Sequence, residues 1–442
     1  MRFCTTTLGC KVNQFETQAI GNILVSRGHI RAEPGEGCDV CIINTCAVTL
    51  DAARKSRQAV RRMINKEPRA LIAVCGCFAQ LDPQVVAELG ADLVGGSGSR
   101  RDFAMEVEKR CGSRGALNPA PRAETIIKDE QNMADLFEEL PPGSADGRTR
   151  ALLKIQDVCD NFCAFCIVPH IRGRSRSLPL ASAVIQARQL EAQGFREIVV
   201  TGIEICSYGK DQKGSPAPVD AFKEIGIAAP SARLRLGSLD PRAVTEDFCN
   251  GLQGIPNLCR HFHLSLQSGC DEILRRMGRR CDADTVRTAI SKLRQSFPDC
   301  GVTADLIIGF PGETEEHFTE TLSFIKEAAF SGMHIFNFSP RPGTPAADMP
   351  EQIPKAVRNE RARITAAVAE DMARNFRFGQ LGKTANVLFE SKRGSTWFGL
   401  SDNYIEVAVK SGGERNQVLN VKMTEVCDKT VLGVVVDQYL LS

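Results

Sequence analysis

The feature that most constrains the fold of this 442-residue chain is a regular alternation of short apolar runs with amphipathic segments. In the first hundred or so residues, apolar runs at 40–43, 70–74 and 91–94 alternate with segments of helical spacing, such as 13–27. This pattern is typical of parallel strands joined by crossover helices. We therefore expect an α/β fold that begins with a small parallel sheet covered by helices.

The alternation continues in the middle of the chain with longer helical segments. Candidate strands lie at 197–201, 234–239, 261–267, 303–308 and 333–338, and a long charged helix is expected at 354–378. About six βα units in succession predict a full or partial TIM-like barrel, in which active sites lie at the carboxyl ends of the strands.

The end of the chain has a different pattern, with five short β-like runs at 387–390, 396–400, 404–409, 418–423 and 431–436. Five such strands predict a small β-barrel of the type that binds oligonucleotides. Its balanced charge leaves a purely structural role open. We expect domains at 1–111, 148–380 and 381–442, with a Pro- and Gly-containing linker at 112–147.

Composition favours a multidomain protein of a reducing compartment, which we expect to be the cytoplasm. The chain has 18 cysteines but is too long for a small disulfide scaffold, and its first residues have no signal-peptide pattern. No apolar run reaches membrane-spanning length, so we expect no membrane contact. The net charge of +2 means that any binding of nucleic acid would depend on a local patch.

Three closely spaced cysteines follow an apolar, strand-like stretch at 151–155, which we expect to be the first strand of the barrel. Cys159, Cys163 and Cys166 have a CxxxCxxC spacing, which suits a 4Fe–4S cluster with one iron left without a protein ligand. Because such an iron can take part in chemistry, this cysteine loop (159–166) favours an enzyme over an electron carrier. The alternatives are packed thiols or a zinc site, although structural zinc normally needs four ligands and no CxxC knuckle follows.

A second set of cysteines stands at the ends of successive predicted strands of the first domain. In a parallel sheet these ends lie together, so Cys10, Cys46 and Cys77 could hold a second cluster or could fill a core. Cys75 is an ambiguous neighbour, but only Cys77 follows the glycine that would open the loop. We discount the CxxC at 38–41 as a redox motif because it enters a strand directly.

Nine short strings of the sequence form a recognisable set. They are LGCKVNQ at 8–14, NTC at 44–46, CGCFAQ at 75–80, CDNFCAFC at 159–166, IVPHIRG at 167–173, TGIE at 201–204, HLSLQSG at 263–269, DLIIGFPGE at 305–313 and FSPRPGT at 338–344. Together they resemble the methylthiotransferase branch of radical S-adenosylmethionine enzymes. The resemblance covers nearly the whole chain, including its end, which resembles the family's TRAM domain. The strings at 8–14 and 159–166 resemble the MtaB type, which acts on threonylcarbamoyladenosine in tRNA.

The resemblance implies two 4Fe–4S clusters and S-adenosylmethionine as cofactors. The cysteine loop would hold the cluster at which S-adenosylmethionine is cleaved to a radical that attacks carbon 2 of an adenine, and the N-terminal cysteines would hold an auxiliary cluster that supplies sulfur. A second S-adenosylmethionine would supply the methyl group. Such an enzyme needs an electron donor such as flavodoxin or ferredoxin, and we expect a monomer.

The resemblance also implies residues that bind S-adenosylmethionine, although each also suits a packing or turn role at a strand end. They are Phe165, Thr201, Gly202 and Glu204, with Gln267, Asp305 and Gly309 on later strands. Two positions depart from the family pattern: Val158 stands where relatives commonly have glycine, and Cys281 where they often have tyrosine.

Local charge suggests the substrate. Arginines cluster around the cysteine loop and at 275–280, and such patches can bind the phosphates of an anticodon stem-loop, although solvated helix faces would look the same. We expect Arg172 and Arg174 to contact RNA. Open alternatives are another tRNA adenosine (isopentenyladenosine), a ribosomal protein side chain, and a non-enzymatic iron–sulfur RNA-binding or redox-sensing protein.

Overall fold

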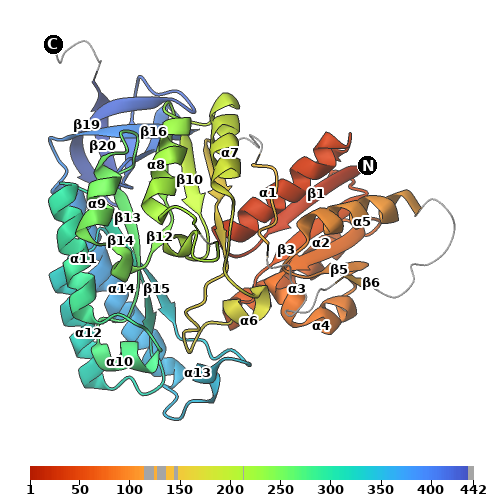
Figure 1. Cartoon of the computed structure of the whole chain (residues 1–442), viewed down its shortest axis with the longest axis horizontal. Helices are drawn as coiled ribbons and strands as arrows, with labels where there is room; N and C mark the ends of the chain where they lie inside the picture. The colour runs from red at the N-terminus through yellow and green to blue at the C-terminus, as the bar shows by residue number, and fades with distance from the viewer. Residues whose placement is uncertain (114–123, 127–135, 144–147, 213, 437–442) are drawn as a thin grey trace.

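The computed structural model describes residues 1–113, 124–126, 136–143, 148–212 and 214–436. It confirms the predicted α/β class. An N-terminal parallel sheet with helices lies beside a partial α/β barrel, and a small closed β-barrel packs at one end of the latter (Figure 1). No helix in the described ranges is long and apolar enough to cross a bilayer.

Six parallel strands form the N-terminal sheet: β1 (Arg2–Thr7), β2 (Ile30–Arg31), β3 (Val40–Thr45), β4 (Leu71–Gly76), β5 (Leu93–Gly95) and β6 (Glu124–Ile126). Their order is β2-β1-β3-β4-β5-β6. Strands β3 and β4 are buried along their whole length, as expected when helices cover both faces of a parallel sheet.

Two apolar clusters, one on each face, hold helices against this sheet. Helices α1 (Lys11–Ser26) and α5 (Arg100–Ser113) contribute to one cluster. Helices α2 (Leu50–Lys66), α3 (Cys77–Leu81) and α4 (Pro83–Glu88) contribute to the other. Because Leu152 and Val199 of the central barrel join the α1 cluster, the two halves of the molecule share a core.

Part of the segment that we expected to be a linker belongs to this unit. Strand β6 lies within 112–147 and pairs in parallel with β5. Farther along, the Asn22 amide donates to the Pro142 carbonyl (2.6 Å), and the Glu138 carboxylate accepts from the backbone N–H groups of Arg100 and Arg101 (both 3.0 Å). The segment therefore extends the sheet and covers α1 and α5, and its remainder lies outside the described residues.

The central barrel is open and consists of two parallel sheets joined in sequence. The strands are β7 (Arg150–Lys154), β10 (Glu197–Thr201), β11 (Arg233–Leu236), β12 (Ser238–Leu239), β13 (His261–Gln267), β14 (Gly301–Ile308) and β15 (Gly332–Asn337). They are ordered β11-β10-β7 and β12-β13-β14-β15. The strand predicted at 234–239 is divided at Gly237, which lies between β11 and β12. A Cβ at this position would lie 2.9 Å from the Val200 carbonyl oxygen, so a larger residue would not fit.

Helices cover the outside of the barrel and enclose its main apolar core. The longer ones are α7 (Leu180–Ala192), α8 (Pro218–Ala228), α9 (Glu246–Gln253), α11 (Ala283–Ser296), α12 (Glu315–Ala328) and α14 (Lys355–Phe378). Short elements at the strand ends are β8 (Gln156–Asp157), α6 (Val168–Arg172), β9 (Arg176–Ser177), η2 (Ile205–Ser207), η3 (Pro241–Ala243), α10 (Asp271–Arg276) and α13 (Pro345–Asp348). The predicted helix at 354–378 is α14.

All five runs predicted near the end of the chain are strands: β16 (Thr384–Arg393), β17 (Thr396–Ser401), β18 (Glu406–Val409), β19 (Val418–Cys427) and β20 (Thr430–Val435). They close in the order β16-β17-β18-β20-β19. Arg233 and Arg235 of β11 attach this C-terminal barrel to the central one by donating to its backbone carbonyls, including Asn386 (2.6 Å) and Ser401 (3.1 Å). The Glu197 carboxylate pairs with both guanidinium groups.

Candidate active site

The cysteine loop lies between β8 and α6, beyond the carboxyl end of β7. Cys163 is buried, and Cys159 and Cys166 are partly exposed. Two backbone hydrogen bonds fix the turn: Cys166 N–H donates to the Cys163 carbonyl (2.9 Å), and Ala164 N–H donates to that of Met277 (2.9 Å). The loop therefore presents three free thiols at the rim where barrels of this kind place their chemistry.

The start of the loop has an unusual backbone conformation. Val158 has φ 66°, in the left-handed region that a β-branched residue rarely adopts. This is one of the two positions noted in the sequence as departures from the resembled pattern, and the departure is accommodated as backbone strain. The Val158 side chain is fully buried and its N–H donates to the Asp157 carboxylate (2.9 Å), and these contacts hold the conformation.

Gln156, which the sequence did not single out, connects this loop to the residues after β10. Its amide nitrogen donates to the Val158 carbonyl (2.5 Å) and to the Ser175 hydroxyl (2.9 Å). Its amide oxygen accepts from the backbone N–H groups of Ile203 (3.1 Å) and Glu204 (2.9 Å). One buried side chain thus fixes two of the segments expected to form the cofactor site.

Arg279 is a second residue whose role the sequence did not reveal, since it stands in a basic run that we assigned to the RNA patch. Its guanidinium donates to the Cys163 sulfur (3.8 Å) and to the Ser265 carbonyl (2.6 Å). It also reaches the sulfur of Cys281 (3.9 Å), the other position noted in the sequence as a departure from the resembled pattern. Arg279 therefore places a positive charge beside the cysteine loop.

Phe165 lies within the cysteine loop, and the residues after β10 lie next to its start. Phe165 packs on the edge of an apolar cluster that contains Phe310 and Phe338. Thr201 ends β10, and a Cβ on Gly202 would lie 2.8 Å from the Gln156 amide oxygen, so this position excludes a larger residue. Burial raises the pKa of Cys159, and the nearby Glu204 carboxylate raises it as well. That carboxylate accepts from Cys206 N–H (2.9 Å) and from the Ser207 hydroxyl.

Burial raises the pKa of Glu204 itself, which is 8% exposed. A buried carboxylate that binds the amino group of a cofactor would recover part of this desolvation cost. The buried carboxylate of Glu204 therefore suits recognition of an ammonium group.

The three candidates on later strands differ in their surroundings. Gln267 ends β13 with φ 75°, which marks a distorted strand end. The Asp305 carboxylate lies 3.2 Å from His263 Nε2, so it already has a partner. Gly309 has φ 74° and donates its N–H to the Glu313 carboxylate (3.0 Å), the geometry of a turn. Asp305 and Gly309 thus have local structural roles that suffice to explain them.

The N-terminal cysteines follow three adjacent strands of the sheet. Cys10 follows β1 and is the N-cap of α1, Cys46 follows β3, and Cys77 follows β4 as the first residue of α3. The pKa of Cys46 is raised to about 12, chiefly by burial and in part by the nearby Cys77 and Cys10 thiols. The three thiols are therefore grouped closely enough to interact electrostatically.

Tight backbone packing surrounds these cysteines. Gly9 has φ 97°, and a Cβ there would lie 2.8 Å from the Cys46 sulfur. Gly76 has φ 99°, and a Cβ there would lie 2.3 Å from the Asn44 side-chain oxygen. Cys75 belongs to the α1 and α5 cluster on the opposite face, so it is the packing residue and Cys77 the candidate ligand.

The donor chemistry of both cysteine sets fits a 4Fe–4S cluster, since each offers three free thiols from tightly constrained loops. In the described part of the chain, no three Cys, His, Asp or Glu side chains converge on a single metal ion. The two observations agree, because the thiolates of such a cluster bind three different irons.

The two arginines that we expected to contact RNA lie in different environments. Arg174 is exposed, with 72% of its side chain accessible, and lies 3.6 Å from Asp160. Arg172 is only 1% exposed and pairs with Glu16 (2.7 Å) and Asp157 (3.2 Å). The prediction for Arg172 is wrong, because its guanidinium is buried between the two halves of the molecule and cannot reach a phosphate.

A cleft opens between the N-terminal sheet and the edge strand of the barrel. Its walls include Leu8 and Gly9, the start of α2, strand β15 and the start of α14. Phe336 projects from β15 with 45% of its surface exposed. Basic residues on its rims are Arg54, Lys55, Arg57, Lys355 and Arg358. An exposed aromatic ring among basic side chains beside Cys10 is a combination suited to single-stranded nucleic acid.

Two family models match the chain. The model of the radical SAM superfamily matches residues 153–325, which include the cysteine loop. The model described as uncharacterized protein family UPF0004 matches residues 2–96, which include the N-terminal cysteines. The fold and the cysteine loop therefore define a radical S-adenosylmethionine enzyme.

Relatives identify the branch of that superfamily. The chain is 36% identical over 411 residues to threonylcarbamoyladenosine tRNA methylthiotransferase MtaB of Bacillus subtilis, covering 91% of this chain and 89% of that protein. It is 30% identical to the tRNA-2-methylthio-N(6)-dimethylallyladenosine synthase of Caldicellulosiruptor saccharolyticus, covering 97% and 91%. The chain belongs to this family of radical S-adenosylmethionine tRNA methylthiotransferases.

Among solved structures, the radical S-adenosylmethionine methyltransferase TsrM from Kitasatospora setae has a similar fold. The TM-score is 0.57 at 15% identity, and the match covers 78% of this chain and 77% of that one. At this identity the similarity concerns the fold alone.

Proposed function

We propose that this protein adds a methylthio group to carbon 2 of N6-threonylcarbamoyladenosine next to the anticodon of tRNA. Cys159, Cys163 and Cys166 would hold one 4Fe–4S cluster, and Cys10, Cys46 and Cys77 an auxiliary one. When bound, the first cluster and S-adenosylmethionine supply a radical that can remove hydrogen from the adenine. A reductant such as flavodoxin or ferredoxin would supply the electron.

The observation that carries this proposal is that an element next to one cysteine set packs against an element that carries part of the other. Helix α6, which begins two residues after Cys166, packs through Ile171 into the cluster that contains Cys77 and Phe78 of α3. The Ser97 hydroxyl also donates to the Ile171 carbonyl (2.9 Å). Two cysteine sets held by adjoining elements support a reaction that needs both on one substrate.

The residues around the loop have separate tasks in this proposal. Glu204 and the backbone after Thr201 would orient the amino group of S-adenosylmethionine, with Gln156 holding that backbone. Phe165 would contact the cofactor's adenine. Arg279 would balance negative charge near Cys163. Together these groups position the cofactor and restrict water at the loop, which is the protein's contribution to such chemistry.

The cleft beside Cys10 supports RNA as the substrate. A single-stranded loop can turn its bases outward onto an aromatic ring while its phosphates meet basic side chains. Phe336 and the basic rim of the cleft offer these two features in a cleft that is also lined by Gly9, the residue before Cys10. A ribosomal protein side chain would not need the aromatic surface.

The choice of threonylcarbamoyladenosine rests on the relatives. The MtaB proteins of Bacillus subtilis and Thermotoga maritima are 36% and 33% identical to the chain, whereas the dimethylallyladenosine synthases of Caldicellulosiruptor saccharolyticus and Syntrophotalea carbinolica are 30% and 31% identical. We further propose that 1–111 carries the auxiliary cluster, 112–147 connects, 148–380 is the catalytic barrel, and 381–442 is a TRAM barrel in a monomeric, cytoplasmic enzyme.

Nucleoside mass spectrometry of tRNA from cells with and without the gene tests the proposal. We expect the methylthio derivative of threonylcarbamoyladenosine to disappear on deletion and to return with the wild-type gene. Loss of the dimethylallyladenosine derivative instead would contradict the substrate assignment. Unchanged tRNA together with a modified ribosomal protein would contradict RNA as the substrate.

Cysteine variants of purified protein then separate the two sites. Changing Cys159, Cys163 and Cys166 to alanine should abolish formation of deoxyadenosine from S-adenosylmethionine. Changing Cys10, Cys46 and Cys77 to alanine should leave that cleavage measurable but stop insertion of sulfur into tRNA. Because loss of a cluster can unfold the domain that holds it, circular dichroism must first show that both variants are folded.

A further inference from the structure

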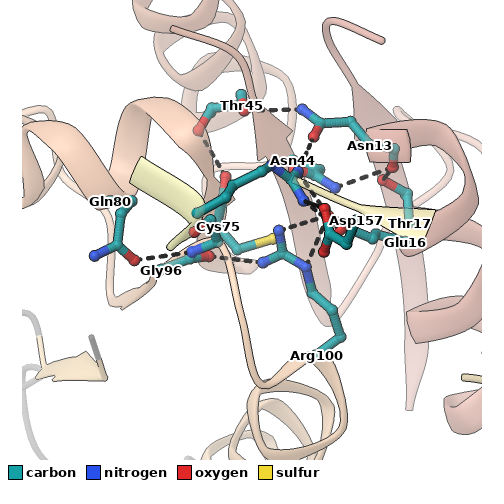
Figure 2. Close-up of polar contacts among 12 residues, drawn as sticks. Asn13, Glu16, Thr17, Asn44, Thr45, Cys75, Gln80, Gly96, Arg100 and Asp157 are labelled. Atoms are coloured by element: carbon teal, nitrogen blue, oxygen red, sulfur yellow. Dashed lines mark hydrogen bonds and ion pairs between the residues drawn. The ribbon is translucent and has the colours of Figure 1, made fainter. Parts of the chain in front are cut away.

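A network of buried charges lies between the N-terminal sheet and the central barrel. Glu16 of α1 is at its centre, paired with Arg100 (2.7 Å), Lys154 (3.0 Å) and Arg172 (2.7 Å). Asp157, which precedes the cysteine loop, pairs with Lys154 (2.8 Å) and Arg172 (3.2 Å). Figure 2 shows Arg100 reaching Glu16 and the Gly96 carbonyl below Asn44 and Asn13. All five charged side chains are at most 5% exposed.

Arg172 connects the elements that carry the two cysteine sets. It ends α6, which follows Cys166, and its guanidinium contacts Asp157 just before the cysteine loop. The same guanidinium donates to the Asn13 side-chain oxygen (2.8 Å) and to Glu16, both on the helix that Cys10 caps. The Arg172 side chain therefore makes hydrogen bonds both to the residue before the cysteine loop and to the helix that Cys10 caps.

Asn13 continues this connection toward the other N-terminal cysteines. Its amide nitrogen donates to the carbonyls of Leu8 (2.9 Å) and Thr45 (3.0 Å), which lie close in sequence to Cys10 and Cys46. In return, the Asn44 amide donates to the Asn13 carbonyl (3.0 Å). A substitution of Arg172 would thus disturb the position of Asn13 and, through its hydrogen bonds, the backbone at the ends of β1 and β3.

The charges in the network do not balance. Four buried cations, Arg100, Lys154, Arg172 and Arg176, share the carboxylates of Glu16 and Asp157, and an excess buried charge is costly unless another group compensates it. The N-terminal cysteines are near enough to compensate it: the Arg172 guanidinium donates to the Asn13 side chain (2.8 Å), which in turn donates to the carbonyls of Leu8 and Thr45, close in sequence to Cys10 and Cys46. Thiolates carrying an iron–sulfur cluster would supply the missing negative charge.

We propose that Arg172 is a positioning residue that stabilises the negative charge of the cluster held by Cys10, Cys46 and Cys77 and fixes that site against the cysteine loop. This inference rests on the auxiliary cluster of the proposed function. Because reduction adds one more negative charge to a cluster, a cation fixed nearby favours the reduced state. Arg172 therefore raises the reduction potential of the auxiliary site.

The test compares a neutral and a charged replacement in the full-length chain. Arg172→Gln and Arg172→Lys are each combined with alanine at Cys159, Cys163 and Cys166, so that only the auxiliary cluster is observed. Reduction is followed by electron paramagnetic resonance during a redox titration. We expect Arg172→Gln to lower the equilibrium constant for reduction about tenfold, which is about 59 mV for one electron, and Arg172→Lys to stay close to the parent.

Arg174→Gln is the matched control, because it removes an exposed arginine from the same segment and should leave the potential unchanged. Loading of the Lys variant but not of the Gln variant would also support the proposal, since charge is what separates them. Equal potentials for Arg172→Gln and the parent, or equal disturbance by Gln and Lys, would overturn it. A parent that binds no iron would overturn the auxiliary site itself, and with it this inference.

Discussion

Val158 and Gln156 together hold the start of the cysteine loop in a conformation that glycine adopts more easily. A left-handed residue of this kind costs about 1–3 kcal/mol and persists only where its surroundings determine it. Here the Gln156 side-chain amide donates a hydrogen bond to the Val158 carbonyl and accepts hydrogen bonds from two backbone N–H groups after β10. The strain at the loop is therefore supported by a single polar side chain.

Replacing Gln156 with alanine should weaken binding of S-adenosylmethionine more than it affects iron content. The change leaves buried backbone groups without partners, at about 1–3 kcal/mol each, and frees the segment before Glu204. Isothermal titration of anaerobically reconstituted protein would measure the affinity, and iron analysis the loading.

Gln186→Ala is a suitable control for this experiment. Gln186 is also buried, but its amide donates to the Leu140 carbonyl, away from the loop. It should lose stability without losing affinity for S-adenosylmethionine. Equal affinities for Gln156→Ala and the wild type would contradict the positioning role of Gln156.

Arg174 is the exposed arginine next to the cysteine loop and remains our prediction for a phosphate contact. Arg174→Ala should weaken tRNA binding and reduce the slope of log K against log salt by about one, because one fewer phosphate is neutralised. Filter binding at several salt concentrations would measure this. Arg363→Ala, on the exposed face of α14, should leave the slope unchanged, and an unchanged slope for Arg174→Ala would remove this residue from the RNA contact.

Among the elements, β10 and β11 attach the C-terminal barrel through a buried ion triad. The Glu197 carboxylate is fully buried and pairs with Arg233 (2.5 Å) and Arg235 (2.7 Å). Both guanidinium groups also donate to carbonyls of the C-terminal barrel. The orientation of that barrel therefore depends on a carboxylate in the central one.

Glu197→Gln should destabilise this attachment by about 3–5 kcal/mol, because it leaves two buried guanidinium groups without their counter-charge. Trp397, the single tryptophan of the chain, lies in β17, so its fluorescence during urea denaturation reports on this region directly. Glu360→Ala, which breaks an exposed pair with Arg363, should cost less than about 1 kcal/mol.

The same triad predicts a pH dependence. The two arginines lower the pKa of Glu197 to about 2, even though burial opposes ionisation. A lowered pKa means that the contribution to stability is present above the ordinary value of about 4.3 and is lost as the pH falls toward 2. The stability difference between wild type and Glu197→Gln should therefore be constant above about pH 5 and shrink below about pH 4. A difference that does not change over this range would contradict the lowered pKa.

For the whole molecule, the sequence predicted best what depends on local pattern. Strands β10 and β13 have the predicted bounds, since each is an apolar or alternating run between turn residues. The long helix α14 and the five strands of the C-terminal barrel follow from the same kind of signal. The same pattern predicted where the candidate cysteines lie relative to the strands. Cys10, Cys46 and Cys77 follow β1, β3 and β4, and the cysteine loop follows β7 and β8.

What the sequence could not predict depends on contacts between distant residues. Arg172 looks like part of a basic surface patch, and only the fold brings it to Glu16, 156 residues away. Strand β6 was missed because a three-residue strand has almost no periodicity of its own. Gln156 carried no signal, since its hydrogen bonds are to backbone groups that any residues could supply.

The shared boundary between the two halves also limits how this family can be recombined. An exchange of the first 111 residues with those of a relative would bring in a new α1 opposite an unchanged α6 and β7. Unless the incoming helix had a carboxylate at position 16 and an amide at position 13, Arg172 and Lys154 would be left buried beside the wrong partners. Chimeras joined near residue 111 should therefore be viable only when these few residues are inherited together.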